Sequence, residues 1–205
     1  MAGGRFISFE GIDGSGKSTQ LRTLARRLRE RGTAVVETRE PGGSEGAESI
    51  RRLLVEGATG RWSAESEVLL FTAARRDHLE RTVRPALADG ATVLCDRFAD
   101  STRVYQGAVR GELREMVDAL HRLAIGVEPD LTLILDLDPD AALARGLARG
   151  GAEDRFERFG ADFQARLRTG FLGLAVEFPA RCRVIPADGP AEAVAARVLA
   201  AVEAA

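Results

Sequence analysis

The chain is poor in several residue types that mark particular classes of protein. Its 2 cysteines, Cys95 and Cys182, are too few for the disulfide framework of a small secreted domain. Cys95 lies in an apolar run, so we expect a buried side chain there and not a nucleophile. No stretch approaches the roughly 18 apolar residues of a membrane-spanning helix, and no apolar signal segment opens the chain. We therefore expect a soluble, cytoplasmic protein with no membrane partner.

An excess of charge of one sign is also absent. The chain has 29 Lys and Arg against 31 Asp and Glu, for a net charge of −2, so we expect no nucleic-acid partner. Lysine itself is nearly missing, because Lys17 is the only one beside 28 arginines. The apolar fraction of 45% is ordinary for a globular protein, and 205 residues fit one domain with at most a small insert.

Lys17 lies in residues 11–18, which fit the phosphate-binding pattern G-x-x-x-x-G-K-[ST] at every fixed position. Glycines let backbone N–H groups converge on phosphate oxygens, while the lysine reaches the β- and γ-phosphates and Ser18 binds Mg²⁺. A strand pattern precedes the motif and a helical pattern follows it, as the motif requires. A glycine-rich turn with an incidental lysine would explain neither flank. The predicted ATP-binding residues are Gly11, Ile12, Asp13, Gly14, Ser15, Gly16, Lys17, Ser18 and Thr19.

Short β-branched runs alternate along the chain with longer amphipathic patterns. The expected strands cover residues 5–10, 34–38, 92–96, 131–137 and 183–187. The expected helices cover residues 17–31, 45–56, 64–88, 112–126, 139–149, 158–178 and 190–204, with Pro190 as the first residue of the last. This alternation predicts a three-layer α/β/α fold of the P-loop NTPase type, with a five-stranded, mostly parallel sheet and a short mobile lid.

Polar segments follow two of these strands directly. Ligands of parallel sheets bind beyond the carboxyl ends of the strands, so residues 39–43 and 96–106 are candidates for a site. Asp96 could bind a Mg²⁺-bound water and Arg97 a phosphate, although a helix-capping aspartate with a structural ion pair would look the same. Residues 38–43 could equally form a tight turn with Arg39 on the surface.

Two further features would suit nucleotide binding, but each also has a purely structural explanation. Phe71 and Arg75 are four residues apart on one helix face, where they could stack on a base and bond its edge. A core phenylalanine beside an arginine that reaches solvent has the same spacing. Residues 148–158 are glycine-hinged and rich in arginine, which suits a lid over a phosphoryl group or a solvated charged loop.

Taken together and in this order, these segments resemble bacterial thymidylate kinase (dTMP kinase). The resemblance rests on residues 9–20, 38–43, 70–71 with 75, 96–98 with 101–102, 105–107, 129–133 and 135–137, and spans about residues 5 to 200. It implies a single nucleoside monophosphate kinase domain over residues 1–205, with a lid at about 146–158. It also implies ATP and dTMP as ligands, Mg²⁺ as cofactor and a homodimer.

The resemblance further implies roles for single residues. Phe71 would stack on thymine, Arg75 and Thr102 would contact its polar edge, and Tyr105 would lie under the deoxyribose. Arg39 and Arg97 would bind the acceptor phosphate, and Ser18 and Asp96 would organise Mg²⁺. The implied substrate-binding residues are Arg39, Glu40, Pro41, Phe71, Arg75, Arg97, Ser101, Thr102, Tyr105 and Gln106. The implied catalytic residues are Lys17, Asp13, Arg97, Arg155 and Arg149.

Members of this family differ in the location of the catalytic arginine, and residues 11–18 contain none here. The chain therefore resembles the lid-arginine type, with Arg155 as first choice and Arg149 as second. Phe98 stands where many relatives have Tyr or His, which removes a polar contact.

Three other functions fit parts of the sequence. A deoxynucleoside kinase would need a carboxylate base, which Glu10 or Asp13 could supply, but paired Arg39 and Arg97 favour a charged acceptor. A GTP-binding switch would need an Asn-Lys-x-Asp element, which a chain whose only lysine is Lys17 lacks. A catalytically inactive, nucleotide-binding relative of thymidylate kinase would keep the same motifs, so the sequence leaves that alternative open.

Overall fold

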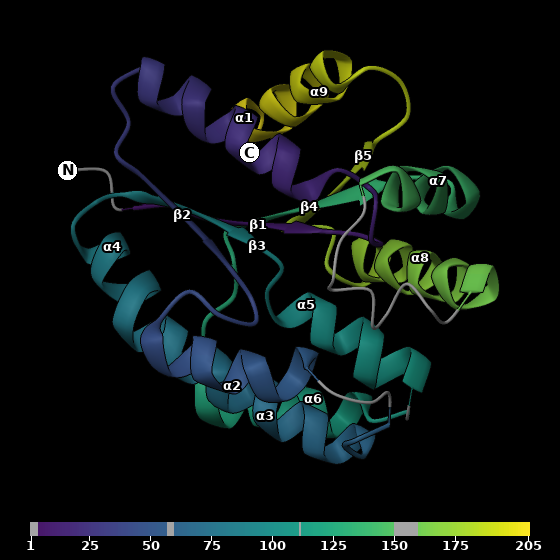
Figure 1. The fold of residues 1–205 in the computed structure, drawn as a ribbon. Helices are drawn as coiled ribbons and strands as arrows, with labels where there is room; N and C mark the ends of the chain where they lie inside the picture. The colour runs from purple at the N-terminus through teal and green to yellow at the C-terminus, as the bar shows by residue number, and fades with distance from the viewer. Residues whose placement is uncertain (1–3, 57–59, 111, 150–159) are drawn as a thin grey trace.

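Five strands form one parallel sheet in the order β2-β3-β1-β4-β5 (Figure 1). The structure is a computed structural model and describes residues 4–56, 60–110, 112–149 and 160–205. The strands are β1 (Phe6–Glu10), β2 (Val35–Arg39), β3 (Thr92–Asp96), β4 (Leu131–Asp136) and β5 (Cys182–Pro186). The predicted fold class is confirmed, and all the pairings are parallel.

The central strands are apolar and buried on both faces, as parallel sheets require. In β1 and β3, neighbouring residues can therefore serve opposite cores. Ile7 and its register partner Leu94 belong to the core that includes α1, whereas Phe6 and its partner Val93 belong to a second core with residues 79–83. Cys95 lies in this second core, and burial raises the pKa of its thiol well above the usual value, as expected for an inert side chain.

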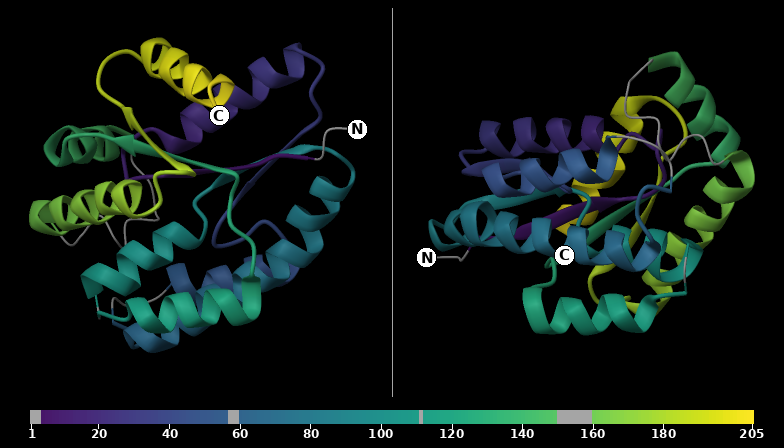
Figure 2. Two further views of the ribbon diagram at one scale, coloured as in Figure 1. Left: turned by 180° about the vertical axis from the view of Figure 1, so that it is seen from behind. Right: turned by 60° about the horizontal axis from the view of Figure 1, so that its bottom comes forward.

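Helices cover the sheet on both faces. Figures 1 and 2 place α1 and α9 on one face and α2 to α6 on the other, while α8 packs against β4 and β5. The α-helices are α1 (Lys17–Glu30), α2 (Glu45–Val55), α3 (Ala64–His78), α4 (Arg84–Ala88), α5 (Ala99–Thr102), α6 (Arg114–Leu120), α7 (Pro139–Arg149), α8 (Gly160–Glu177) and α9 (Ala191–Glu203). Wider π-helical turns are η1 (Leu79–Val83), η2 (Arg103–Arg110) and η3 (His121–Ile125).

The helix predictions hold with four differences. The helix expected over 112–126 is present as α6 followed by η3. The helix expected over 64–88 is present as the succession α3, η1 and α4, with the wide turn η1 just ahead of Pro85, which has no N–H to donate. The last helix begins at Ala191, because Pro190 is extended at ψ 147° and precedes it. Helix α5 with η2, over Ala99–Arg110, was not predicted as a helix at all.

The strand register brings separate segments to one edge of the sheet. Phe9 is paired with Asp96 of β3, and Glu10 with Ile134 of β4, so β1, β3 and β4 end side by side. The residues that follow these strands, 11–18, 97–106 and 137–138, start from this common edge. Among the described residues, every helix is too short or too polar to cross a lipid bilayer.

Candidate active site

A loop with three glycines in left-handed or related backbone conformations joins β1 to α1. Gly11, Gly14 and Gly16 have φ angles of 132°, 82° and 96°. A Cβ on Gly14 would lie 2.1 Å from the carbonyl oxygen of Ala142, so only glycine fits there. Because α1 begins at Lys17, directly after this turn, the loop has the shape that presents backbone N–H groups and a helix N-terminus to phosphate. We call residues 11–18 the P-loop.

Lys17 is buried and folded back onto the P-loop. Its Nζ donates to the carbonyl oxygens of Gly11 at 3.1 Å and Ile12 at 2.8 Å. Burial lowers the pKa of Lys17 to about 8, and the nearby positive charge of Arg97 adds to this effect. Asp13, whose carboxylate is 3.9 Å from Nζ, acts in the opposite direction. A phosphate would replace the two carbonyl contacts and favour the charged amine.

Ser18 and Asp96 bring two oxygen ligands together from different segments. The Ser18 hydroxyl donates to Asp96 Oδ2 at 2.5 Å, from the first turn of α1 to the end of β3. Hydroxyl and carboxylate oxygens suit Mg²⁺, which usually takes one or two protein ligands and fills its shell with phosphate and water. Within the described residues no three His, Cys, Asp or Glu side chains cluster to hold a metal by themselves. The donor set therefore fits a Mg²⁺ ion that arrives with a nucleotide.

Arg97 joins the P-loop to the segment after β3. Its Nη1 donates to the carbonyl oxygen of Gly11 at 3.2 Å and to Ser101 Oγ at 2.9 Å, while Nη2 pairs with Asp13. Its guanidinium also lies 5.2 Å from the ring centroid of Tyr105, whose hydroxyl donates to Asp13. Burial alone would raise the pKa of Asp13, but Arg97 and Lys17 hold it below its usual value. Asp13 is thus a charged acceptor beside two cations.

Arg75 is buried and bonded on several sides. Its Nε donates to Glu40 Oε2 at 2.6 Å, and its Nη2 donates to Thr102 Oγ1 at 2.9 Å and to the carbonyl oxygen of Phe98. His78 contacts the other carboxylate oxygen of Glu40 at 2.9 Å, so the arginine does not simply reach solvent. Phe71 lies one helical turn before Arg75 and is partly exposed. The pair offers an aromatic face and a fixed donor from one helix.

Glu10 ends β1 with a fully buried carboxylate. Its Oε1 accepts from the backbone N–H of Phe98 at 2.7 Å, and its Oε2 accepts from the Ser101 hydroxyl at 2.6 Å. Burial and the negative charge of Asp100 raise the pKa of Glu10 to about 7. Both oxygens face the N-terminus of α5, not the P-loop.

Known proteins of one family are similar to this chain in sequence and fold. A sequence model of the family described as "Thymidylate kinase" matches residues 9–198. The thymidylate kinase of Jannaschia sp. (strain CCS1) is 67% identical over 93% of this chain and 91% of its own. That of Caulobacter vibrioides is 56% identical over 97% and 95%. The crystal structure of thymidylate kinase from Ehrlichia chaffeensis superposes with a TM-score of 0.80 at 37% identity, covering 98% of this chain and 99% of that one.

The chain belongs to the thymidylate kinase family. The resemblance inferred from the motifs is thereby confirmed.

Other residues that the family resemblance singled out have their own contacts. Arg39 is exposed and pairs with Glu48 at 3.1 Å. Pro41 follows a cis peptide bond, and its carbonyl oxygen accepts from Arg51 at 2.6 Å. Gln106 is buried and donates to Glu67 Oε2 at 3.1 Å. Thr19 is exposed at the start of α1.

The predicted lid lies largely beyond the described residues. Arg155 is among the residues that are not described, and Arg149 is described only as the last residue of α7. The choice between them as the catalytic arginine therefore stays a prediction.

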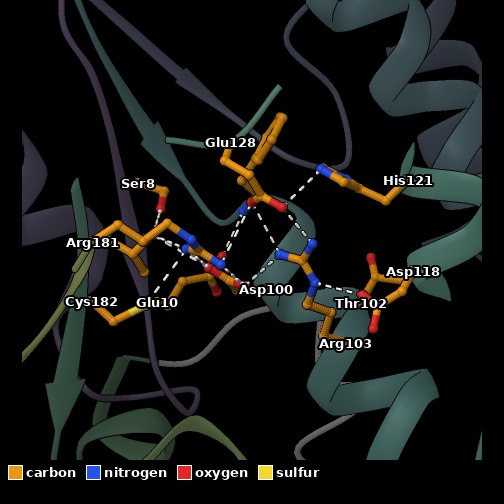
Figure 3. A network of polar contacts seen from close by, with 12 residues as sticks. Ser8, Glu10, Asp100, Thr102, Arg103, Asp118, His121, Glu128, Arg181 and Cys182 are labelled. Carbon is orange, nitrogen blue, oxygen red and sulfur yellow. Dashed lines mark hydrogen bonds and ion pairs between the residues drawn. The ribbon is translucent and has the colours of Figure 1, made fainter. Parts of the chain in front are cut away.

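A second group of charges, away from the P-loop, anchors α5 (Figure 3). Asp100 accepts from Arg103 at 2.8 Å and from Arg181 at 2.5 Å and 2.9 Å, and all three are largely buried. Arg103 also bonds Glu128 at 2.5 Å, and His121 lies 3.0 Å from the same carboxylate. These contacts tie the helix that carries Ser101, Thr102 and Tyr105 to the start of β5 and the segment before β4.

The sequence patterns did not predict the buried polar side chains that bond the site residues. His78, Glu67 and Asp100 are buried polar side chains whose partners come from distant segments. His78 is three residues after Arg75 and so on the same helix face, which is the one signal that could have indicated it. Phe98 lacks a polar tip, and its ring is buried edge-on to Phe6 at 4.9 Å, so it serves the core.

Proposed function

We propose how this site carries out the reaction of the thymidylate kinase family, the ATP-dependent phosphorylation of dTMP to dTDP. The position of Arg97 carries the proposal. Its guanidinium bonds both a P-loop carbonyl and Asp13, so a cation lies where a bound ATP and a second phosphate would meet. A nucleoside acceptor has no phosphate that could use this cation. A monophosphate acceptor does, which favours dTMP over thymidine.

The P-loop holds the donor in this proposal. The backbone of residues 11–18 and Thr19 surrounds the ATP phosphates, and Lys17 moves from the carbonyl oxygens of Gly11 and Ile12 to the phosphate oxygens. Ser18 and Asp96 would hold Mg²⁺, which would supply positive charge to the phosphates when bound. Lys17 and Arg97 need only small movements, since both already lie within contact distance of Asp13.

The acceptor nucleotide is held by side chains from α3 and α5 with η2. Phe71 stacks on thymine, while Arg75 and Thr102 contact its polar edge. Glu40 accepts from Nε of Arg75 while Thr102 accepts from Nη2, and the two contacts together limit its rotation. Tyr105, Ser101 and Gln106 line the sugar side, and Arg39 and Pro41 approach from the end of β2.

Proton transfer demands little of the protein here. The attacking oxygen belongs to a phosphate that is already ionised near neutral pH, so positioning and charge neutralisation carry the step. The final cation comes from the lid, where Arg155 is the first candidate and Arg149 the second. Closure of the lid would also exclude water, which otherwise competes as acceptor.

The test is an ADP-release assay with ATP and Mg²⁺ that offers dTMP, dUMP, thymidine and GMP separately. We expect turnover to be fastest with dTMP and absent with thymidine. The missing thymine methyl is worth only about 1–3 kcal/mol, so slower turnover of dUMP is also expected. Turnover of thymidine would identify a deoxynucleoside kinase. ATP binding without turnover of any acceptor would identify a catalytically inactive module.

We also propose that the protein is a cytoplasmic homodimer. Leu53, Leu69 and Leu123 are exposed, at 38%, 52% and 81%, and they come from α2, α3 and η3 on the same side of the sheet. Apolar side chains grouped on one side suit burial against a second copy. Light scattering on a sizing column should give twice the 22.0 kDa of one chain.

A further inference from the structure

Glu10 is a buried carboxyl group with no evident place in the phosphoryl transfer itself. Its exposed fraction is 0%, although it directly precedes the P-loop. Carboxylates are rarely buried this completely unless hydrogen-bond donors compensate the loss of water. Both of its donors, the N–H of Phe98 and the hydroxyl of Ser101, come from the segment that begins with Arg97. The side chain therefore serves that segment and not the P-loop.

The first contact of Glu10 fixes the backbone at Arg97. Arg97 has a φ angle of 72°, in the left-handed region that costs a non-glycine residue about 1–2 kcal/mol. The N–H of Phe98 belongs to the peptide group that directly follows Arg97, and it points at Glu10 Oε1 at 2.7 Å. This bond stabilises the left-handed turn, together with the bonds of the Arg97 N–H to Phe9 and of the Arg97 carbonyl oxygen to Cys95.

The second contact fixes the side chain of Arg97. Ser101 donates its hydroxyl hydrogen to Glu10 Oε2 at 2.6 Å, so its oxygen presents lone pairs elsewhere. That oxygen accepts from Arg97 Nη1 at 2.9 Å. A carboxylate at position 10 thus sets the direction of the Ser101 hydroxyl, and the hydroxyl sets the position of the guanidinium.

We propose that Glu10 is a positioning residue for Arg97 and not the proton acceptor of the reaction. The inference rests on the proposed function, in which Arg97 binds the acceptor phosphate. A carboxylate that followed β1 and served as a base would face the acceptor oxygen. Here both oxygens of Glu10 are already acceptors toward α5.

A double-mutant cycle tests the inference. Glu10→Gln keeps the size of the side chain but places an N–H₂ group against Ser101, which loses its acceptor. Loss of a hydrogen bond to a charged group corresponds to about tenfold to hundredfold, and we expect a fall in kcat/KM for dTMP of this size, with KM for dTMP raised. In an Arg97→Met background the same substitution should change kcat/KM by less than about threefold, because there is no guanidinium left to position.

The controls separate positioning from general damage. Ser8→Ala removes another buried hydrogen bond of β1, to Thr132 at 2.9 Å, and should leave the kinetic constants unchanged. ATP affinity of Glu10→Gln should stay within about threefold of wild type, since neither contact of Glu10 lies in the P-loop. If Glu10→Gln does not fold, Ser101→Ala with and without Arg97→Met tests the side-chain contact in the same way.

Different results would overturn different statements. An equal loss from Glu10→Gln in both backgrounds, or no loss in either, would overturn the positioning role. A fall of kcat alone, with KM for dTMP unchanged and a pH–rate profile that loses its acidic limb, would identify a base instead. Normal kcat/KM for Arg97→Met alone would refute the proposed function of Arg97 itself and leave Glu10 as a separate question.

Discussion

Single polar side chains in this site already bond one another or the backbone, in the space that phosphates would enter in the proposed function. Lys17 bonds two carbonyl oxygens, Arg97 pairs with Asp13, and Ser18 donates to Asp96. Substrate binding would exchange these contacts for phosphate and metal contacts without a large search of conformations. Such preorganised charge is usually the largest contribution to catalysis of phosphoryl transfer.

Removal of the single lysine should therefore abolish turnover. We expect Lys17→Ala to lower kcat by about a thousandfold or more, because the transferring phosphoryl group loses a cation that no other lysine can replace. ADP release with saturating ATP and dTMP measures the effect, and thermal unfolding checks the fold. Near-normal turnover would refute the assignment of residues 11–18 as a catalytic P-loop.

The buried carboxylate of Glu10 should make stability depend on pH. Its pKa is raised from 4.5 to about 7, so the folded state keeps a proton that the unfolded state releases. The contribution of this group to stability is therefore complete below pH 4.5 and is lost as the pH rises through 7. We therefore expect the difference in unfolding free energy, Glu10→Gln minus wild type, to increase by about 2 to 3 kcal/mol between pH 5 and pH 8.

Urea unfolding of both proteins at the two pH values measures this gain. Other groups also titrate in this range, so only the difference between the two proteins is informative. A difference that stays constant with pH would contradict the raised pKa.

At the scale of helices and strands, the sequence predicted the sheet well and one helix badly. Strands were found because apolar β-branched runs are bounded by turn residues, and their order placed residues 11–18 and 96 at one edge. Helix α5 with η2 was missed because Ser101, Thr102 and Gly107 are weak helix formers. What holds that helix is tertiary: Val104 and Tyr105 are buried, and Asp100 bonds two arginines.

The same limit applies to the residues behind the site. Glu40, Arg75 and His78 form one buried group, but positions 40 and 75 are far apart in the chain and no local pattern links them. Arg39 could be predicted at the end of β2, whereas its pairing with Glu48 of α2 depends on how the turn between them folds.

Helix α3 leads to a prediction about acceptor binding. Phe71→Ala should raise the KM for dTMP while kcat changes little, because stacking on a base is worth about 1–3 kcal/mol in binding. Thr72→Ala is the matched control, since the Thr72 hydroxyl bonds the carbonyl oxygen of Val68 in its own helix. A selective loss of kcat in Phe71→Ala would mean that the thymine ring does not stack on Phe71.

The segment between α7 and α8 leads to a prediction about catalysis. If Arg155 supplies the final cation, Arg155→Ala should lower kcat by about 10³ to 10⁵ with ATP affinity nearly unchanged. Arg149→Ala should have the smaller effect. The opposite ranking in single-turnover experiments would exchange the two roles.

For the whole molecule, stability and the site depend on the same buried ions. Asp100 links Arg103 of η2 to Arg181 before β5 (Figure 3). The hydroxyl of Thr132 in β4 also donates to Asp100, at 3.3 Å. Two arginines share one carboxylate, so the helix that carries Thr102 and Tyr105 is fixed to the far half of the sheet. Loss of this anion would leave the two arginines with only the more exposed carboxylates of Glu128 and Asp118 as partners among the described residues.

Asp100→Asn should accordingly destabilise the protein by about 3–5 kcal/mol, which is the usual cost of breaking a buried ion pair. Asp118→Asn is the control, because Asp118 also bonds Arg103 but its side chain is 35% exposed. Chemical denaturation of both variants gives the comparison. Equal effects would mean that burial of Asp100 does not decide its contribution.

The lone lysine has a consequence for labelling chemistry. Lys17 carries the only ε-amine of the chain, and its pKa of about 8 makes it a better nucleophile than an ordinary surface lysine at mildly alkaline pH. Acylating reagents that resemble a nucleotide would therefore mark one ε-amine per chain, and bound ATP would protect it. The fraction of modified Lys17, read by mass spectrometry, would then report directly how many P-loops are occupied.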